Sequence, residues 1–278
     1  MKILYYFKLL RPLNVIISAI SVVISAAIVN GLGDTKTLII ASVIVMLYAA
    51  GSNALNDAID HEIDLINRPS RPIPSGHVTI NEALVISFVF FSLGSALCLQ
   101  LPTTAIIIGV VIAVPMMIVY STHLKGKSIL GNIAVSLILG MAFLFSGAAY
   151  DSIVPMWIPM MLAFGLTFIR ELVKDIADMD GDQFSGLQTF PIIYGINRSI
   201  QLIVLLCVLV GCGSFIPYFN GIYGVGYVLL LVIGVEIPLV VVIVLLMKNP
   251  SISSATYCAR ILKFSTLMGL FAIYLGTI

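Results

Sequence analysis

Charge is scarce in this sequence, and that scarcity decides the class of protein. Only 10% of the 278 residues are charged and 60% are apolar, whereas soluble domains carry about 25% charged residues. A globule of this length could not hide so much apolar surface from water, so lipid must be the solvent. The net charge is +1 and there is no basic run, which argues against nucleic acid as a partner.

Cysteine is also rare. The chain has four cysteines, and all of them lie in apolar runs without the spacing of metal ligands. We interpret them as small apolar residues of helices.

Long apolar runs dominate what remains. A helix needs about 20 apolar residues to cross the hydrocarbon core, and backbone groups in lipid must find their partners within the structure. The sequence therefore predicts an all-α fold, with residues 1–278 forming a single polytopic membrane bundle of nine transmembrane helices. The nine runs lie at about 12–30, 37–57, 81–100, 102–120, 130–149, 154–175, 197–217, 222–247 and 256–277.

The basic residues predict the orientation. With the N-terminus in the cytoplasm, thirteen of the fourteen basic residues fall on the cytoplasmic side and only Lys36 lies outside. Cytoplasmic connections carry such an excess of Lys and Arg. We therefore expect a multi-pass protein of the cell membrane whose C-terminus lies outside.

Two sets of acidic residues occupy the cytoplasmic ends of the second and sixth spans. Both sets follow the spacing i, i+4, i+7 and i+11, which forms one polar stripe on a helix. We expect each helix to fray before the last member. We call these sets the first ladder and the second ladder; their members are Asn53, Asp57, Asp60 and Asp64, and Glu171, Asp175, Asp178 and Asp182.

The segments after the two ladders are also alike. A Pro-Ile-Pro-Ser-Gly segment at 72–76 follows the first, and a Pro-Ile-Ile-Tyr-Gly segment at 191–195 follows the second. The ladders lie four spans apart, so both helices run in the same direction. This pattern indicates two related four-helix units, although convergence on one ligand would produce the same likeness.

The ladders require a ligand. Two carboxylates 5 Å apart repel by roughly 3 kcal/mol at an effective dielectric near 20, so they must protonate or capture cations. Magnesium suits carboxylates that share it with substrate phosphates. Nearby bases then suit an anion such as a diphosphate: Arg68, Arg71, Lys125, Lys127, Arg170 and Lys174. The alternative is a pair of solvated helix ends, and the matched spacing of the two ladders weighs against it.

These residues resemble the UbiA superfamily of intramembrane prenyltransferases, along the whole chain. The first ladder matches the signature Asn-Asp-x-x-Asp-x-x-x-Asp, the second matches Asp-x-x-x-Asp, and a Tyr followed by Lys in a connecting loop is similar to a third. The matching residues are Asn56, Asp57, Asp60 and Asp64, then Asp178 and Asp182, then Tyr120 and Lys125.

Segments 67–76 and 170–182 most resemble the members that build archaeal ether lipids, with Ala177 as one departure where an acid is expected. That resemblance implies transfer of a geranylgeranyl group from geranylgeranyl diphosphate to the free hydroxyl of geranylgeranylglyceryl phosphate, at a site that faces the cytoplasm. The partners would be these two substrates and membrane lipid.

The resemblance also implies roles for individual residues. Asp57, Asp60, Tyr120 and Asp178 would be catalytic. Tyr120 would screen the allylic cation, and Asp57 or the leaving diphosphate would accept the proton. Magnesium would be held by Asn56, Asp60, Asp64, Asp178 and Asp182. The diphosphate would contact Arg68, Lys125 and Lys174. Arg11 and Arg71 would be left for the phosphate of the acceptor.

Two other functions compete. The first is a prenyltransferase with an aromatic acceptor from quinone synthesis. The second is a transporter, but its ion sites would lie at the midplane, where only Glu236 is found. We interpret Glu236 either as a protonated acid bonded to backbone freed by Pro238 or as a residue facing a pocket.

Overall fold

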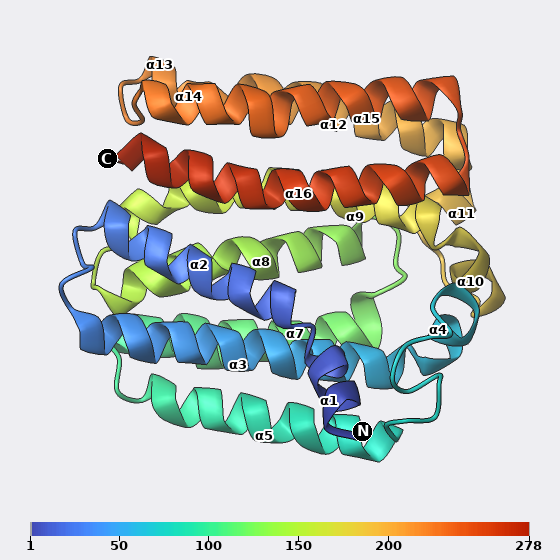
Figure 1. The fold of residues 1–278 in the computed structure, drawn as a ribbon, viewed down its shortest axis with the longest axis horizontal. Helices are drawn as coiled ribbons and strands as arrows, with labels where there is room; N and C mark the ends of the chain where they lie inside the picture. Colours follow the sequence, from blue (N-terminus) through green and yellow to red (C-terminus); the bar gives the residue numbers. More distant parts are fainter. Residues whose placement is uncertain (1, 278) are drawn as a thin grey trace. The chain divides into compact units, whose positions relative to one another are not determined.

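The computed structural model describes residues 2–277, and within this range the chain is helical and contains no β-strand (Figure 1). Contacts divide the chain into two compact units. Unit 1 comprises residues 1–125 and 141–156, and unit 2 comprises residues 126–140 and 157–278. Each unit contains one of the two ladders. The relation between two four-helix units stays a prediction.

Unit 1 is built around α3 (Thr35–Ile59), which packs against α2 (Pro12–Ile28) and α5 (Ile80–Cys98). The side chain of Asp34 caps α3 by accepting from the Thr37 N–H (3.1 Å), which satisfies one of the free donors at a helix start. The other elements of unit 1 are α1 (Lys2–Leu10), α4 (His61–Asn67), α6 (Thr103–Ile106), η1 (Ile107–Ala113), α7 (Val114–Val119), η2 (Tyr120–Leu124), the second half of α8 (Leu130–Ala149) and η3 (Val154–Met156).

Unit 2 is built around α16 (Ile252–Thr277), which packs against α9 (Trp157–Ala177), α14 (Val225–Leu231) and α15 (Ile237–Lys248). A further helix, α12 (Ile196–Ser214), packs against both α9 and α15. The remaining elements are the first half of α8, α10 (Met179–Phe184), α11 (Phe190–Tyr194), α13 (Ile216–Phe219) and η4 (Val232–Glu236).

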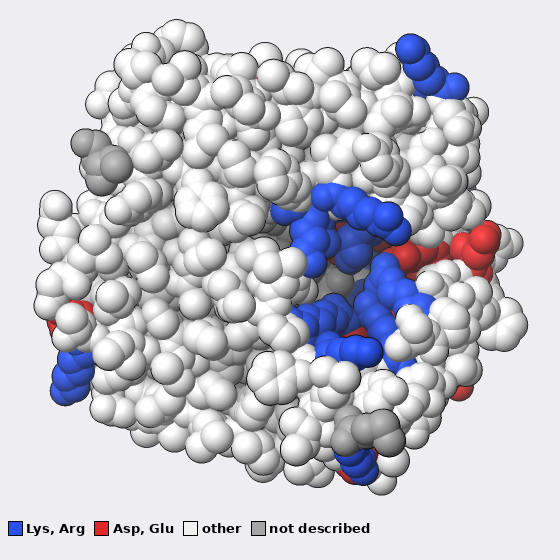
Figure 2. Space-filling view, viewed as in Figure 1, with Lys and Arg blue, Asp and Glu red and all other residues white. Residues whose placement is uncertain are grey.

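The helices confirm a polytopic membrane bundle. Among the described residues, eight helices are long and apolar enough to cross a membrane, and a ninth span arises if α1 and α2 are counted together across their 44° bend. The fourth predicted span is longer than expected, because it continues to Leu124. Most of the surface in Figure 2 carries neither acidic nor basic side chains, as lipid contact requires.

Two prolines within spans follow π-helical turns. The turn η1 precedes Pro115 and η4 precedes Pro238; such wide turns accommodate a residue that lacks an N–H. Glu236 ends η4, and its Oε1 accepts a hydrogen bond from Ser214 Oγ of α12 (2.8 Å). Its partner is therefore a hydroxyl, and not the backbone freed by Pro238 that one of the two interpretations of Glu236 required.

Candidate active site

The first ladder lies where α3 ends. The helix stops at Ile59, Asp60 caps it with φ −81° and ψ 5°, and α4 begins at the next residue. The ladder therefore continues through a helix break into a second short helix. All four members are buried, with Asp57, Asp60 and Asp64 only 2–3% exposed. Asp57 lies before the break, Asp60 lies at it, and Asp64 lies after it.

Basic side chains neutralise the three buried carboxylates. Lys125 pairs with Asp60, and Arg11 pairs with Asp57. Arg71 joins two acids: it contacts Asp57 (3.2 Å) and forms a hydrogen-bonded pair with Asp64. A buried charge is tolerated when it is paired in this way. Within unit 1, three residues predicted to bind substrate thus form ion pairs with three residues predicted to be catalytic or to bind metal.

Arg11 has an unusual backbone. It lies between α1 and α2 with φ 52° and ψ 69°, in the left-handed region that costs a non-glycine residue about 1–2 kcal/mol. Pro12 follows, and a residue before proline is disfavoured in the right-handed helical region. The chain therefore bends here. Figure 2 shows basic side chains gathered in one group on the face that it presents.

Tyr120 begins a turn to which the side chain of Asn56 is hydrogen-bonded. We predicted that the fourth span ends at Tyr120 and that a loop follows it, but the structure continues the span through the π-helical turn η2, Tyr120–Leu124, so the loop begins later than predicted. The next residue in this turn, Ser121, donates to Asn56 Oδ1 (2.7 Å). Lys125 follows the turn, and its N–H donates to the Tyr120 carbonyl (2.8 Å). The end of this span therefore binds the Asn56 side chain and the Lys125 backbone, while Lys125 Nζ pairs with Asp60.

Arg68 lies directly after α4. Its N–H donates to the Asp64 carbonyl oxygen (2.9 Å), and its own carbonyl accepts from the Arg71 N–H (3.0 Å). The segment after the first ladder is thus tied to α4 through its backbone, which explains why Arg71 reaches back to Asp64.

The second ladder lies at the end of α9 in unit 2. Glu171 is 6% exposed and accepts hydrogen bonds from Arg170 (2.9 Å) and Lys174 (2.7 Å). Asp175 accepts from Asn132 Nδ2 of α8 (2.8 Å). Lys174, predicted to contact the diphosphate, is therefore a partner of Glu171. Asn132 was missed, although an amide in the first turn of an otherwise apolar helix was a usable signal.

The two ladders share a local backbone geometry. Asp178 caps α9 with φ −98° and ψ 6°, and α10, which contains Asp182, begins at the next residue. In both ladders the last aspartate donates its N–H to the carbonyl of the capping aspartate: Asp64 to Asp60 at 2.8 Å, and Asp182 to Asp178 at 3.1 Å. Each helix therefore ends before the last member of its ladder, as predicted, but the last member lies in a new short helix that the sequence did not predict.

The acidic groups suit magnesium as a set of hard oxygen donors. Within residues 2–277, no three acidic, histidine or cysteine side chains are close enough to hold a metal by themselves. Magnesium, however, uses one or two carboxylates together with waters and substrate phosphates, so the pairs present here fit. Burial raises the pKa of the Asp64 carboxyl, and Arg71 opposes that rise.

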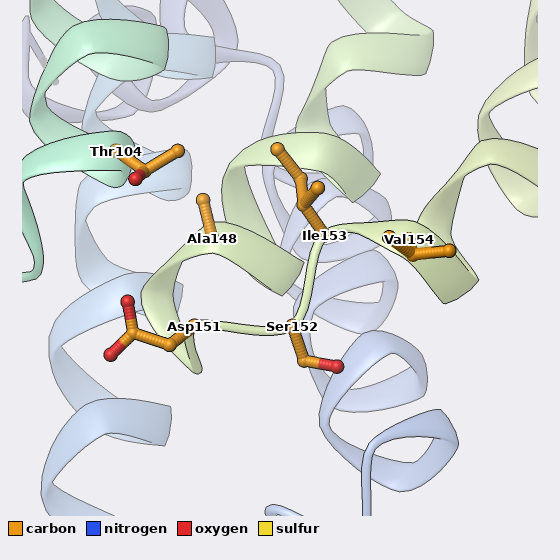
Figure 3. Close-up of a pocket in the computed structure, with 6 residues that line it drawn as sticks. All are labelled: Thr104, Ala148, Asp151, Ser152, Ile153 and Val154. Atoms are coloured by element: carbon orange, nitrogen blue, oxygen red, sulfur yellow. The ribbon is translucent and has the colours of Figure 1, made fainter.

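A pocket of unit 1 lies near the start of α3, whereas the first ladder lies near the end of that helix. It has a volume of about 300 Å³ and is lined by Thr104, Ala148, Asp151, Ser152, Ile153 and Val154 (Figure 3). A Cβ added to Gly31, before the start of α3, would lie 2.7 Å from the ring of Tyr150. This pocket therefore belongs to the end where α3 begins. Its lining has no basic side chain for a diphosphate.

Buried carboxylates paired with lysine and arginine lie at a helix end of a polytopic membrane bundle. The chain belongs to the UbiA prenyltransferase family, which matches residues 16–267 and therefore crosses both units.

Individual relatives are similar over almost the whole length. The digeranylgeranylglyceryl phosphate synthase of Saccharolobus solfataricus is 33% identical over 277 residues, covering 98% of this chain and 96% of the relative. A solved structure of a digeranylgeranylglyceryl phosphate synthase is also 33% identical, with a TM-score of 0.78, covering 100% of this chain and 99% of that chain. A UbiA homologue from Archaeoglobus fulgidus bound to GPP and Mg²⁺ shares the fold, with a TM-score of 0.69 at 16% identity, covering 97% of this chain and 99% of that one.

Proposed function

We propose that this protein transfers a geranylgeranyl group from geranylgeranyl diphosphate to the free hydroxyl of geranylgeranylglyceryl phosphate. One observation carries the proposal: the chain is 33% identical to a digeranylgeranylglyceryl phosphate synthase along nearly its full length. The reaction breaks the bond between C1 of the prenyl chain and the diphosphate oxygen, and it forms an ether bond to the acceptor oxygen.

Metal binding would come from the capping and following aspartates. Asn56, Asp60 and Asp64 of unit 1, and Asp178 and Asp182 of unit 2, are the proposed magnesium ligands. Bound magnesium would neutralise the negative charge that develops on the leaving diphosphate, which is the main requirement for ionising an allylic diphosphate.

The basic residues would bind the diphosphate once it enters. Arg68, Lys125 and Lys174 are proposed to donate to its oxygens. Lys125 and Lys174 pair with Asp60 and Glu171 in the structure, so each already lies beside an acidic group of its ladder. Tyr120 would shield the allylic cation from water, and Asp57 or the departing diphosphate would accept the proton of the acceptor hydroxyl.

Acceptor binding would use Arg11 and Arg71. A phosphorylated glycerol ether is dianionic and therefore needs bases beyond those that hold the diphosphate, whereas an aromatic acid carries one negative charge. Both arginines lie within unit 1, and both form an ion pair with Asp57. The site would face the cytoplasm, because thirteen of fourteen basic residues fall on that side when the N-terminus is placed there.

The test is an assay of purified protein in detergent with labelled geranylgeranyl diphosphate and magnesium. Geranylgeranylglyceryl phosphate should give an ether product and free diphosphate, a chelator should abolish both, and 4-hydroxybenzoate should give little product. Asp60→Asn should be inactive, while Asp151→Asn, in the pocket of Figure 3, serves as the matched control and should retain activity. Faster turnover of 4-hydroxybenzoate would overturn the ether-lipid proposal in favour of an aromatic acceptor.

A further inference from the structure

We propose that Asn53 is a positioning residue that holds Arg11 in place for the phosphate of the acceptor. The inference rests on the proposed function, since it assigns Arg11 to that phosphate. It concerns a residue of the first ladder for which neither metal binding nor substrate contact has been proposed. The residues involved all lie within unit 1.

The bend at Arg11 leaves one carbonyl without a helical partner. In a continuous helix the Leu10 carbonyl would accept from the Asn14 N–H, but here that N–H donates to the Arg11 carbonyl (2.9 Å). The Leu10 carbonyl is instead satisfied by Asn53 Nδ2, which donates to it across the unit (2.9 Å). Asn53 is 9% exposed, so water is a poor substitute.

This hydrogen bond acts on the backbone next to Arg11. Pro12 disfavours the right-handed helical region at Arg11, and the left-handed conformation of a non-glycine residue persists when its surroundings hold it. Asn53 fixes the residue before Arg11 and Asp57 contacts the Arg11 guanidinium. These two residues lie one turn apart on α3, so the same face of one helix fixes the backbone and the side chain of this segment.

Asparagine suits this position because it donates without adding charge. An aspartate here would turn its oxygen toward the Leu10 carbonyl oxygen, and it would compete with Asp57 for the Arg11 guanidinium. Alanine would leave a buried carbonyl unpaired. Either change should allow Arg11 to leave the left-handed region, and the guanidinium would then spend less time where the acceptor phosphate binds.

The experiment is a double-mutant cycle of Asn53→Ala and Arg11→Gly, with steady-state kinetics for both substrates. Asn53→Ala should raise the KM for geranylgeranylglyceryl phosphate by about fivefold, the loss expected for one buried hydrogen bond, and should leave kcat and the KM for geranylgeranyl diphosphate nearly unchanged. In the Arg11→Gly background, where glycine tolerates positive φ and the guanidinium is absent, Asn53→Ala should have no further effect.

A matched control is Asn220→Ala. Asn220 also donates its amide to a backbone carbonyl, that of Ile216, at the same distance of 2.9 Å, but at an exposed position in unit 2. This variant should leave both KM values unchanged. If Asn53→Ala is not obtained as a folded protein, Asn53→Gln, which keeps the donor one methylene further out, replaces it in the double-mutant cycle. The expected rise in the KM for geranylgeranylglyceryl phosphate is then smaller.

The outcomes separate the two proposals. A wild-type protein without ether-forming activity would refute the proposed function. An active wild type in which Asn53→Ala raises the acceptor KM equally in both backgrounds, lowers only kcat, or changes nothing would refute the role of Asn53 while leaving the proposed function intact.

Discussion

Removing the charge of Arg71 should destabilise unit 1, because two buried acids depend on this one side chain. Arg71 Nη1 contacts Asp57 and Asp64, and the two residues are 2% and 3% exposed. Asp57 keeps Arg11 in an Arg71→Gln variant, whereas Asp64 is left as an unpaired buried carboxylate. Such a loss costs about 3 kcal/mol, which is a large part of the stability of most domains.

The assay is reversible unfolding in detergent without magnesium, with two further variants for comparison. Asp64→Asn in the Arg71→Gln background removes the unpaired charge, so the double variant should recover most of the lost stability. Arg198→Gln changes an exposed arginine of unit 2 and should alter stability by less than about 0.5 kcal/mol. Equal instability of the single and double variants would refute the reasoning, because it would point to lost packing of the arginine stem.

The pH dependence gives an independent check. Burial raises the pKa of Asp64 above its ordinary value of 3.8, and Arg71 lowers it. The folded protein therefore keeps the Asp64 proton to a higher pH than the unfolded chain does. The stability from this group is fully present below pH 3.8 and is lost as pH rises through the folded pKa. Without Arg71 that pKa rises further, so Arg71→Gln should lose stability with rising pH over a wider range than the wild type.

Three further predictions concern catalysis, topology and packing. Asp178→Asn should lower turnover by about 10²–10⁴-fold in the product assay while unfolding as the wild type does; activity above about a tenth of wild type would contradict a metal role. In a cysteine-free background, a cysteine at Ser70 should label from the cytoplasmic side and one at Asn220 from outside; the reverse pattern would contradict the proposed orientation. Gly211→Ala would place a Cβ 2.7 Å from Oε2 of Glu236 and should lower stability by about 1–3 kcal/mol in the same unfolding assay; an additional Glu236→Ala should restore it, and a double variant as unstable as the single one would show another cause.

Hydropathy was sufficient to predict the spans, because their length is set by the thickness of the membrane. Eight of the nine predicted spans meet the length and composition test on their own. The first is the exception, since α2 alone has 17 residues and reaches a ninth span only together with α1. The sequence showed Pro12 as a helix start, but the left-handed Arg11 before it depends on contacts with α3 that no local pattern contains.

The spacing of the acidic residues predicted where the ladders lie. It could not predict which basic side chain pairs with which acid. The stripe of Asp57, Asp60 and Asp64 is recovered as a buried set. Which base meets which acid depends on how the α1–α2 bend and the turn η2 return to α3. Lys125 therefore could be placed near the acids from its sequence position, while its pairing with Asp60 could not. The Asn132–Asp175 bond likewise depends on how α8 packs against α9, which the spacing of the acids does not contain.

The pairings also constrain how the proposed reaction keeps the site neutral. In unit 1 three buried carboxylates are matched by three bases, Arg11, Arg71 and Lys125, so the site without ligand carries no net charge from this set. Under the proposed function, Asp60 and Asp64 would hold the metal ion, and Lys125 and Arg71, which pair with them here, would then be available to phosphate oxygens. Metal and anion must then bind together, because either alone would leave buried charge unmatched. Under the proposed function, the same residues would therefore stabilise the unliganded fold and select an anion that arrives with its cation.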